Sequence, residues 1–282
     1  MALLADRAAH NGGFLTRREL SAFDVDGEPL RLIDQSRGIW NPKWMDATLS
    51  IVSSADGPYQ DEELNGGLFR YDYRAGSIEG DNRKLRLTQE LRVPVILLRK
   101  IESGVYVPVF PVYVVADDKV NRRFLLALDE SVRFLRDPLH PTEDERRYAE
   151  RVVKTRLHQP EFRGRVIRAY ATSCTVCRLH HAELLDAAHI APDGHELGQP
   201  VVSNGLSLCK IHHSAYDNDL LGISPDYVVK IDKDLLAERD GPMLKHGLQE
   251  MHGRTLTLPL RELEWPDPQR LAIRYERFAS TG

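Results

Sequence analysis

Cys174-Thr175-Val176-Cys177 is followed, after 31 intervening residues, by Cys209-Lys210-Ile211-His212. The three cysteines of these two stretches are the only cysteines among the 282 residues of the chain. Each stretch brings two side chains together on a tight turn, and two such turns can bind one zinc ion through three thiolates and one imidazole. The spacing therefore predicts a structural zinc site at Cys174, Cys177, Cys209 and His212, with no open position on the metal.

Two other uses of the cysteines agree less well with the sequence. Scattered cysteines usually act as small buried hydrophobic residues, but the paired two-residue spacing argues against scattered positions. A disulfide framework is disfavoured by the odd cysteine count. The sequence also contains no signal peptide and no apolar run of membrane-spanning length, so we expect a reducing, cytoplasmic setting and no membrane partner.

Three polar stretches accompany the cysteines: Asp186-Ala187-Ala188-His189-Ile190, Ser203-Asn204-Gly205, and His212-His213-Ser214-Ala215-Tyr216-Asp217. With them, residues 174–222 resemble the HNH, or ββα-metal, endonuclease motif in the variant that carries a zinc site beneath the active site. The signature residues of that motif correspond to His189, Asn204 and His213. The resemblance implies a metal-dependent endonuclease that hydrolyses phosphodiester bonds.

The chemistry of that reaction explains the residue types. An imidazole titrates near neutral pH, so His189 is expected to act as the general base that takes a proton from water. Asn204 is expected to orient the loop beside it. His213 and Asp217 are four residues apart, on one face of a predicted helix that begins near Lys210, and are expected to bind magnesium or manganese.

One position departs from the commonest family pattern, in which an Asp or His directly precedes the general base and also binds the metal. This chain has Ala188 there. Asp186 is the candidate replacement ligand. Without a replacement the ion would keep more water ligands, which a magnesium-type ion tolerates.

The length allows two domains that each bury a core. A net charge of −4 does not by itself indicate a nucleic-acid partner. Residues 146–168 differ from this average, because they contain eight Lys and Arg residues against two Glu residues. A local basic segment of this kind can bind phosphates, although a solvated helix face is the ordinary alternative.

This basic segment is predicted to be helical. Thr142 and Glu145 can form a capping box at the start of a helix that runs to about residue 157. Pro160 predicts the start of a second helix that leads to the first cysteine. The residues on one face of the first helix that are expected to follow DNA phosphates are Arg147, Arg151 and Lys154.

The sequence before Pro138-Leu139-His140-Pro141 has the composition of strands. The predicted strands, rich in β-branched and aromatic residues, are Ala47–Val52, Phe69–Tyr73, Val93–Lys100, Val105–Val115 and Arg123–Leu128. We therefore predict an α+β chain with three parts: a mainly β domain over 1–138, a helical basic linker over 139–172, and a nuclease domain with a C-terminal extension over 173–282. In the extension we expect strands at 227–231 and 255–258 and a helix at 268–278.

Several segments of the first part follow one another in an order that resembles an SRA-like domain of the PUA superfamily: Tyr59–Glu63, Leu68–Tyr73, Gly80–Leu85 and Val93–Ile96. SRA domains hold a flipped, modified cytosine between aromatic side chains. The residues that we expect to contact DNA in this part are Tyr71, Tyr73, Asp81, Asn82, Arg83 and Lys84. Arg83, Lys84 and Arg86, beside Asn82, are expected in a loop that faces phosphates. The alternative for the two tyrosines is a packed sheet face.

A modified-base reader before a metal-dependent nuclease resembles the modification-dependent, type IV-like restriction endonucleases that defend bacteria against phage. The resemblance implies double-stranded DNA carrying 5-methylcytosine or 5-hydroxymethylcytosine as substrate, and enzymes of this kind often act as homodimers. Two alternatives remain open. One is an HNH nuclease of repair or phage defence with a different trigger, and the other is a zinc-stabilised DNA-binding protein that does not cut.

Overall fold

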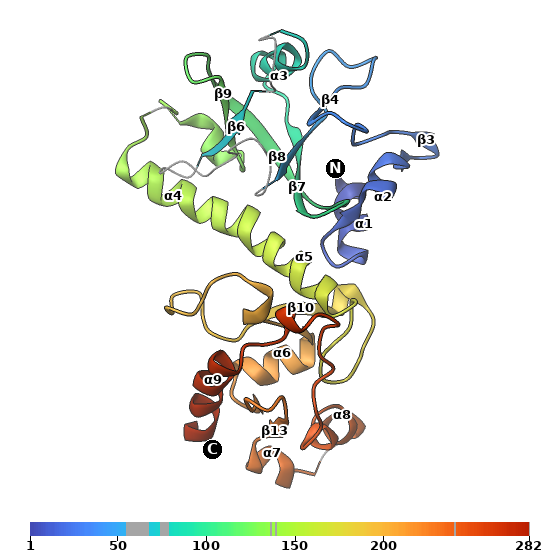
Figure 1. Cartoon of the computed structure of the whole chain (residues 1–282), viewed down its shortest axis with the longest axis vertical. Helices are drawn as coiled ribbons and strands as arrows, with labels where there is room; N and C mark the ends of the chain where they lie inside the picture. The colour runs from blue at the N-terminus through green and yellow to red at the C-terminus, as the bar shows by residue number, and fades with distance from the viewer. Residues whose placement is uncertain (55–67, 74–78, 136, 139, 240, 282) are drawn as a thin grey trace. The chain divides into compact units, whose positions relative to one another are not determined.

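The computed structural model describes residues 1–54, 68–73, 79–135, 137–138, 140–239 and 241–281. The chain forms two compact units. Unit 1 comprises Met1–Ala9 and Gly13–Glu161, and unit 2 comprises His10–Gly12 and Phe162–Gly282. Helices and strands occur in both units, which confirms the predicted α+β class (Figure 1).

Unit 1 is built on a curled seven-stranded sheet in which β4, β5, β7, β8, β9 and β6 are neighbours in that order and β1 pairs with β8. The strands are β1 Leu15–Thr16, β4 Ile39–Trp40, β5 Ser50–Ser54, β6 Phe69–Asp72, β7 Val95–Glu102, β8 Val105–Asp118 and β9 Arg123–Ala127. All pairs are antiparallel except β5 with β7. Each of the five predicted strands has a counterpart among β5 to β9.

The long strand β8 connects the two halves of this sheet. Its residues 105–112 pair with β7, and its residues 113–118 pair with β9. A register shift between Val114 and Ala116 marks a bulge, which bends the strand and increases its twist. The bulge therefore lets one strand belong to two differently oriented parts of the sheet.

Both faces of the sheet are covered. The helices of unit 1 are α1 Ala2–His10, α2 Arg17–Ser21, α3 Asp81–Glu90, the 3₁₀ turn η1 Ser131–Phe134 and α4 Glu143–Val153, and a small hairpin is formed by β2 Asp24–Val25 and β3 Glu28–Pro29. Along β7, Val95 and Leu97 face the apolar cluster that contains Leu85 of α3. Ile96 and Leu98 face the opposite cluster, to which α1 and α2 contribute. This alternation is the two-residue period of a strand with two covered faces.

The basic segment is helical, as predicted. The capping box is present, because Thr142 N–H donates to Glu145 (2.7 Å) and Glu145 N–H donates to the Thr142 hydroxyl (3.4 Å). α4 leads into the π-helical turn η2 Lys154–His158 and then into α5 Gln159–Ala169. Pro160 has no N–H with which to continue the regular bonding pattern, which accounts for the irregular turn just before it.

The centre of unit 2 is a pair of antiparallel strands followed by a helix. β10 (Leu185–His189) pairs with β11 (Gly205–Cys209), and α6 (Lys210–Asp217) packs on both (Figure 1). A side chain at Gly205 would place its Cβ 2.4 Å from Val166 Cγ2. Glycine is therefore required for the close packing of α5 on β11.

The rest of unit 2 surrounds this centre. Its other elements are η3 Ala182–Leu184, η4 Val202–Asn204, β12 Leu221–Ile223, β13 Val229–Ile231, α7 Lys233–Ala237, α8 Pro242–Gly247, η5 Gln249–Met251, η6 Glu262–Glu264 and α9 Pro268–Thr281. β12 pairs with β13. One apolar cluster includes Leu185, Leu206, Leu221 and Leu271, so the second hairpin and α9 share the core of the first hairpin.

Two local predictions were wrong. Residues 82–84 and 86 were expected in a loop but lie in α3, because buried Asn82, Leu85 and Thr88 recur at helical spacing on one face. Residues 255–258 were expected as a strand but form only an isolated bridge between Val228 and Thr255. Leu256 N–H donates to the Tyr227 carbonyl (2.9 Å), but Thr257 N–H donates to the carbonyl of Thr175 in the first cysteine turn (2.8 Å).

Candidate active site and metal centre

The four predicted zinc ligands converge. The ligand atoms of Cys174, Cys177, Cys209 and His212 all lie within 4.8 Å of one another. His212 Nδ1 is 3.1 Å from Cys209 Sγ and 3.4 Å from Cys174 Sγ. Zinc–sulfur bonds of about 2.3 Å in a tetrahedron put ligand atoms about 3.5–4 Å apart, so the set has the dimensions of a zinc site. The 3.9 Å between Cys177 Sγ and Cys209 Sγ is far from a disulfide bond.

The local structure explains this convergence. Arg178 N–H donates to the Cys174 carbonyl (2.9 Å), which closes the first turn, and Arg178 adopts a positive φ of 63°. Cys209 ends β11 and His212 lies on the first turn of α6. The Nε2 of His212 is 2.7 Å from the Gly247 carbonyl. A hydrogen bond there orients the ring so that Nδ1 faces the three sulfurs, which is the usual outer partner of a zinc-binding histidine.

His189 lies at the end of β10, opposite Gly205 of β11. Its imidazole stacks on Phe162, with ring centroids 4.0 Å apart and an interplanar angle of 17°. It lines a cavity of about 490 Å³ whose other lining residues are Ala187, Ile190, Pro192, Asp193, His213, Asp217, Arg274 and Arg277. His189 is thus half-buried, stacks on an aromatic ring and lines the cavity, while its Nε2 atom is buried.

Ala188 faces the other way. It is 1% exposed and belongs to the apolar core of unit 2, whereas its neighbours Ala187 and His189 line the cavity. The alternation of a strand accounts for this difference.

Asn204 is buried and holds the loop that follows His189. Its Oδ1 accepts from Ala191 N–H (2.8 Å), and its Nδ2 donates to the carbonyls of Ala191 (3.1 Å) and Gln199 (3.1 Å). The Asn204 carbonyl accepts from Ile190 N–H (3.0 Å). One side chain therefore connects both ends of the loop between β10 and β11 close to His189.

His213 and Asp217 lie on the exposed face of α6, four residues apart, and both line the cavity. The distance from His213 Nε2 to Asp217 Oδ2 is 3.4 Å. Neighbouring ligands of an octahedral magnesium-type ion are about 3 Å apart, so these two atoms are close to the spacing that one ion requires. The donor set of one imidazole and one carboxylate suits magnesium or manganese better than a thiolate-binding metal.

Asp186 lies on the opposite side of His213. Its Oδ2 is 3.1 Å from His213 Nδ1, and its Oδ1 accepts from Lys210 Nζ (2.6 Å). Partial burial opposes ionisation of this carboxyl, but the hydrogen bonds from Lys210 and His213 outweigh it and lower the pKa of Asp186. Asp186 therefore contacts the ring nitrogen of His213 that is turned away from Asp217.

Two arginines of α9 complete the cavity, and the sequence reasoning missed both. Arg274 is 8% exposed and donates to Asp219 and to the Tyr216 carbonyl. Arg277 Nε donates to Asp219 Oδ2 (2.9 Å), and Arg277 Nη2 reaches the Asp217 carbonyl (3.4 Å). Burial opposes ionisation of Asp219, but Arg274 and Arg277 outweigh it and lower its pKa. The sequence did contain a signal for these two residues, because arginines at 270, 274 and 277 fall on one face of the predicted C-terminal helix.

The predicted DNA contacts of unit 1 lie in three places. Tyr71 and Tyr73 are 5% and 4% exposed and belong to a sheet core, and Tyr73 Oη bonds to Asp117. The first turn of α3 carries Asp81, Asn82, Arg83 and Lys84, of which Asn82 is buried, Arg83 is exposed and Lys84 Nζ donates to the Met45 carbonyl (3.1 Å).

The third place is the predicted basic stripe. Arg147, Arg151 and Lys154 are exposed on α4 and η2. Arg147 pairs with Glu143 one turn earlier (2.5 Å). The predicted segment 59–63 lies outside the described residues. Within the described part of the chain, no helix has the length and apolar character to cross a bilayer.

Comparisons with known proteins agree with the geometry of unit 2. Residues 174–224 match the family model of the HNH endonuclease domain. No curated protein matches the chain. The chain is also similar to several solved structures, two of which follow. A modification-dependent TagI restriction endonuclease has 19% identity and a TM-score of 0.31, with 86% of each chain covered.

The other is the type IV phosphorothioation-dependent restriction endonuclease ScoMcrA, with 14% identity and a TM-score of 0.26, covering 88% of this chain and 52% of that one. TM-scores this low establish neither a shared arrangement nor a shared substrate. The predicted zinc ligands and the predicted catalytic residues all lie within the 51 residues, 174–224, that the family model matches. The chain therefore carries an HNH endonuclease domain at residues 174–224 and is a nuclease.

Proposed function

We propose that this chain is a metal-dependent endodeoxyribonuclease that recognises a modified base in double-stranded DNA and hydrolyses phosphodiester bonds at a one-metal ββα site. The main support for the nuclease activity is that one cavity is lined both by His189, from the end of β10, and by His213 and Asp217, from α6. An acceptor for a water proton and two metal-binding side chains thus meet in one space that is open to a phosphate.

In this mechanism His189 takes a proton from water as the water oxygen bonds to phosphorus and the bond from phosphorus to the leaving oxygen breaks. The stack on Phe162 limits rotation of the imidazole, and Asn204 fixes the loop that begins beside it. Orientation of this kind contributes because the base must lie within hydrogen-bond reach of the water.

His213, through Nε2, and Asp217 would bind the catalytic ion, magnesium or manganese. When bound, such an ion neutralises charge that develops on the phosphate. Asp186 is a positioning residue in this account, because its contact with Nδ1 turns Nε2 of His213 toward Asp217. The ion would then keep several water ligands, as magnesium does readily.

The zinc site would be structural. Its four ligands come from both sides of the ββα centre, so a bound zinc ion ties the first cysteine turn to the start of α6. The next side chain after His212 is His213. We infer that zinc fixes the start of α6 and through it the metal-binding face of that helix.

The division of labour along the chain is also part of the proposal. We assign residues 1–138 to recognition of modified DNA by an SRA/PUA-like domain, 139–172 to a basic helical linker, and 173–282 to the nuclease. The substrate that the resemblance favours carries 5-methylcytosine or 5-hydroxymethylcytosine. By the same resemblance, phage defence is the proposed role, a homodimer the proposed cutting form and the cytoplasm the proposed location.

One observation favours a second candidate. Tyr71 and Tyr73 are buried in the sheet core, so neither ring offers a face on which a base could stack. This supports an HNH nuclease whose trigger is not a base read by these tyrosines. Arg83, Arg151 and Lys154 remain exposed and would serve DNA backbone binding in either candidate.

Cleavage of matched duplexes tests the proposal. The duplexes would differ only in cytosine, 5-methylcytosine, 5-hydroxymethylcytosine, glucosylated hydroxymethylcytosine or methylated adenine, and each would be incubated with magnesium and with manganese. Cutting confined to a modified-cytosine duplex is the expected result. Equal cutting of all duplexes would contradict modified-base recognition while retaining the nuclease, and no cutting of any duplex would contradict the proposal as stated.

A further inference from the structure

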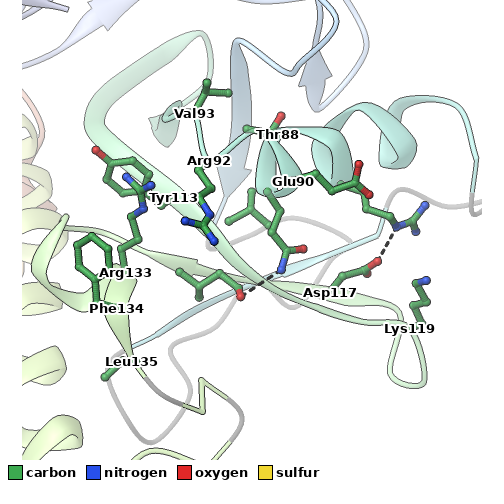
Figure 2. Close-up of a pocket in the computed structure, with 14 residues that line it drawn as sticks. Thr88, Glu90, Arg92, Val93, Tyr113, Asp117, Lys119, Arg133, Phe134 and Leu135 are labelled. Atoms are coloured by element: carbon green, nitrogen blue, oxygen red, sulfur yellow. Dashed lines mark hydrogen bonds and ion pairs between the residues drawn. The ribbon is translucent and has the colours of Figure 1, made fainter.

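Unit 1 has a large cleft, and of the residues predicted to face DNA only Arg86 lines it. Its volume is about 790 Å³, and it lies beside the second half of α3, the distal part of β8 and η1. We call it the α3 cleft (Figure 2). Its charged lining residues are Arg86, Glu90, Arg92, Asp117, Lys119 and Arg133. This volume is within the range of sites that hold a small organic group.

The cleft has an excess of positive charge. Arg86 Nε pairs with Asp117 Oδ2 at 2.5 Å, so these two charges compensate each other. Arg133 pairs with Glu130, which does not line the cleft, at 3.7 Å. Arg92 and Lys119 then remain against one further acid of the lining, Glu90. Arg92 and Lys119 are exposed, and within the described residues neither side chain has an ion-pair partner. These cations attract an anionic ligand.

An aromatic surface accompanies the charge. Phe134 is 72% exposed, which is unusual for a phenylalanine next to charged groups. The Arg133 guanidinium lies 4.6 Å from the ring centroid of Tyr113 and 5.3 Å from that of Phe134. Figure 2 shows these three side chains together at one side of the cleft, Lys119 at the other side and Arg92 between them.

The backbone at Arg92 gives a second, independent observation. Arg92 follows the end of α3 with a positive φ of 54°, and Val93 N–H donates to the Thr88 carbonyl (3.2 Å). This is the helix-terminating position at which glycine is strongly favoured, because a side chain strains the left-handed backbone. An arginine there accepts that strain and directs a guanidinium into the cleft.

We propose that the α3 cleft binds an unpaired segment of DNA, with phosphates on Arg92 and Lys119 and a base stacked on Phe134. Surfaces that combine unpaired cations with exposed aromatic rings suit single strands, because every base offers a π-face and every nucleotide a phosphate. The inference rests on DNA being the substrate of the proposed nuclease. It assigns strand binding to residues that are not in the first turn of α3 or on α4.

Binding measurements on the full chain test this proposal. Fluorescence anisotropy would follow a labelled 20-nucleotide single strand and the matching duplex, without added divalent ions so that cleavage does not interfere. Arg92→Gly removes the guanidinium at a position where glycine relieves backbone strain, so the variant should fold. Arg122→Gly is the matched control, because Arg122 is also exposed, also has a φ of 54°, and does not line the cleft.

We expect Arg92→Gly to weaken single-strand binding about fivefold and to reduce the salt dependence by about one phosphate contact, a slope change of about 0.7. Phe134→Ala should weaken it about fivefold or more, and Phe134→Leu nearly as much, because stacking needs the ring. Arg122→Gly should bind as the wild type does. Duplex binding should change less than single-strand binding.

Equal losses for Arg92→Gly and Arg122→Gly, or no loss for either, would overturn the cleft as a DNA site. A loss for Arg92→Gly on duplex alone, with Phe134→Ala unchanged, would overturn the unpaired strand as its occupant. Because the readout is binding, a chain that cuts no DNA but loses strand affinity with Arg92→Gly refutes the nuclease proposal and supports this one. If the wild type cuts DNA and the variants bind single strands as tightly as the wild type does, the nuclease proposal is supported and the cleft proposal is overturned.

Discussion

The candidate active site of unit 2 and the α3 cleft of unit 1 are built in opposite ways. The active-site residues His189, His213 and Asp217 come from one short ββα segment, and the four predicted zinc ligands converge in the same part of the chain. The cleft takes its lining from three separate segments, over 86–93, 113–119 and 133–135. Bond hydrolysis needs side chains in fixed mutual geometry, whereas strand binding needs charge and a flat ring over a larger area.

Loss of zinc should have the largest effect on stability, and it should affect unit 2 while leaving unit 1 folded. The apparent binding energy of structural zinc in small sites, about 10–16 kcal/mol, is as large as the whole stability of a typical domain, about 5–15 kcal/mol. We expect Cys209→Ser to lose zinc, to abolish cleavage and to unfold the ββα centre, while unit 1 keeps its own cores. Metal analysis and hydrogen exchange measured segment by segment would test this.

Retained protection of β10, β11 and α6 in a zinc-free protein would contradict the structural role of the ion. Loss of protection in unit 1 as well would contradict the independence of the two cores. Ser214→Ala, at an exposed position on α6, is a control that should leave both zinc content and protection unchanged.

The next largest effect is expected at Asp219, which ties α9 to the active-site helix. Asp219→Asn should lower the free energy of unfolding by about 3 kcal/mol, because it leaves the buried Arg274 without its carboxylate. The pKa of Asp219 is lowered in the fold, so this contribution is present above the ordinary Asp pKa of about 3.9 and is lost as the pH falls below it.

Chemical denaturation at neutral and at acidic pH, followed in unit 2, would measure both the loss of stability in Asp219→Asn and its dependence on pH. The exposed Asp226→Asn is the control and should change stability by less than about 0.5 kcal/mol. A destabilisation of Asp219→Asn that stays constant down to pH 2 would refute the ionised pair as its cause.

Arg277 should affect catalysis more than stability. It lines the cavity with a side chain that is 60% exposed, so its ion pair with Asp219 contributes less than about 1 kcal/mol. Arg277→Ala is expected to lower the single-turnover cleavage rate about tenfold, or 1.4 kcal/mol, if the guanidinium stabilises charge on the phosphate. The exposed Arg254→Ala is the charge-matched control, and equal rates for the two variants would remove Arg277 from the site.

The smallest effect is expected in the cleft. Lys119→Gln should weaken DNA binding by about two- to threefold and flatten its salt dependence, because one phosphate contact is lost. The cleavage rate at saturating DNA should not change, since Lys119 does not line the active-site cavity. A lower rate at saturation would show that the two regions are not separable in function.

The same contrast explains what could be predicted from sequence. The zinc ligands and the residues of the HNH motif lie within 44 positions, from 174 to 217, and their spacing can be recognised without a structure. The strands were predictable because β-branched residues alternate across the sheet. The α3 cleft was not predictable, because Arg92, Lys119 and Phe134 share no spacing and meet only through the fold.

Two particular residues show where local patterns were insufficient. Tyr71 and Tyr73 have the alternation of a strand, but only the structure shows that both rings face the core of unit 1. Arg277 lies 53 residues beyond the end of the HNH match at position 224, and it enters the cavity because α9 packs on β12. Long-range packing of this kind leaves a weak basic periodicity as its only trace in the sequence.

The central claim is that His189 is the general base of a metal-dependent nuclease, and the most direct measurement is the single-turnover cleavage rate of His189→Ala on the wild type's best DNA substrate, with magnesium. Zinc content and DNA affinity would be measured on the same preparation. We predict a rate at least about 100-fold below that of the wild type, with zinc content and affinity unchanged. A variant that cuts at the wild-type rate would contradict the assignment of His189 and, with it, this account of the site.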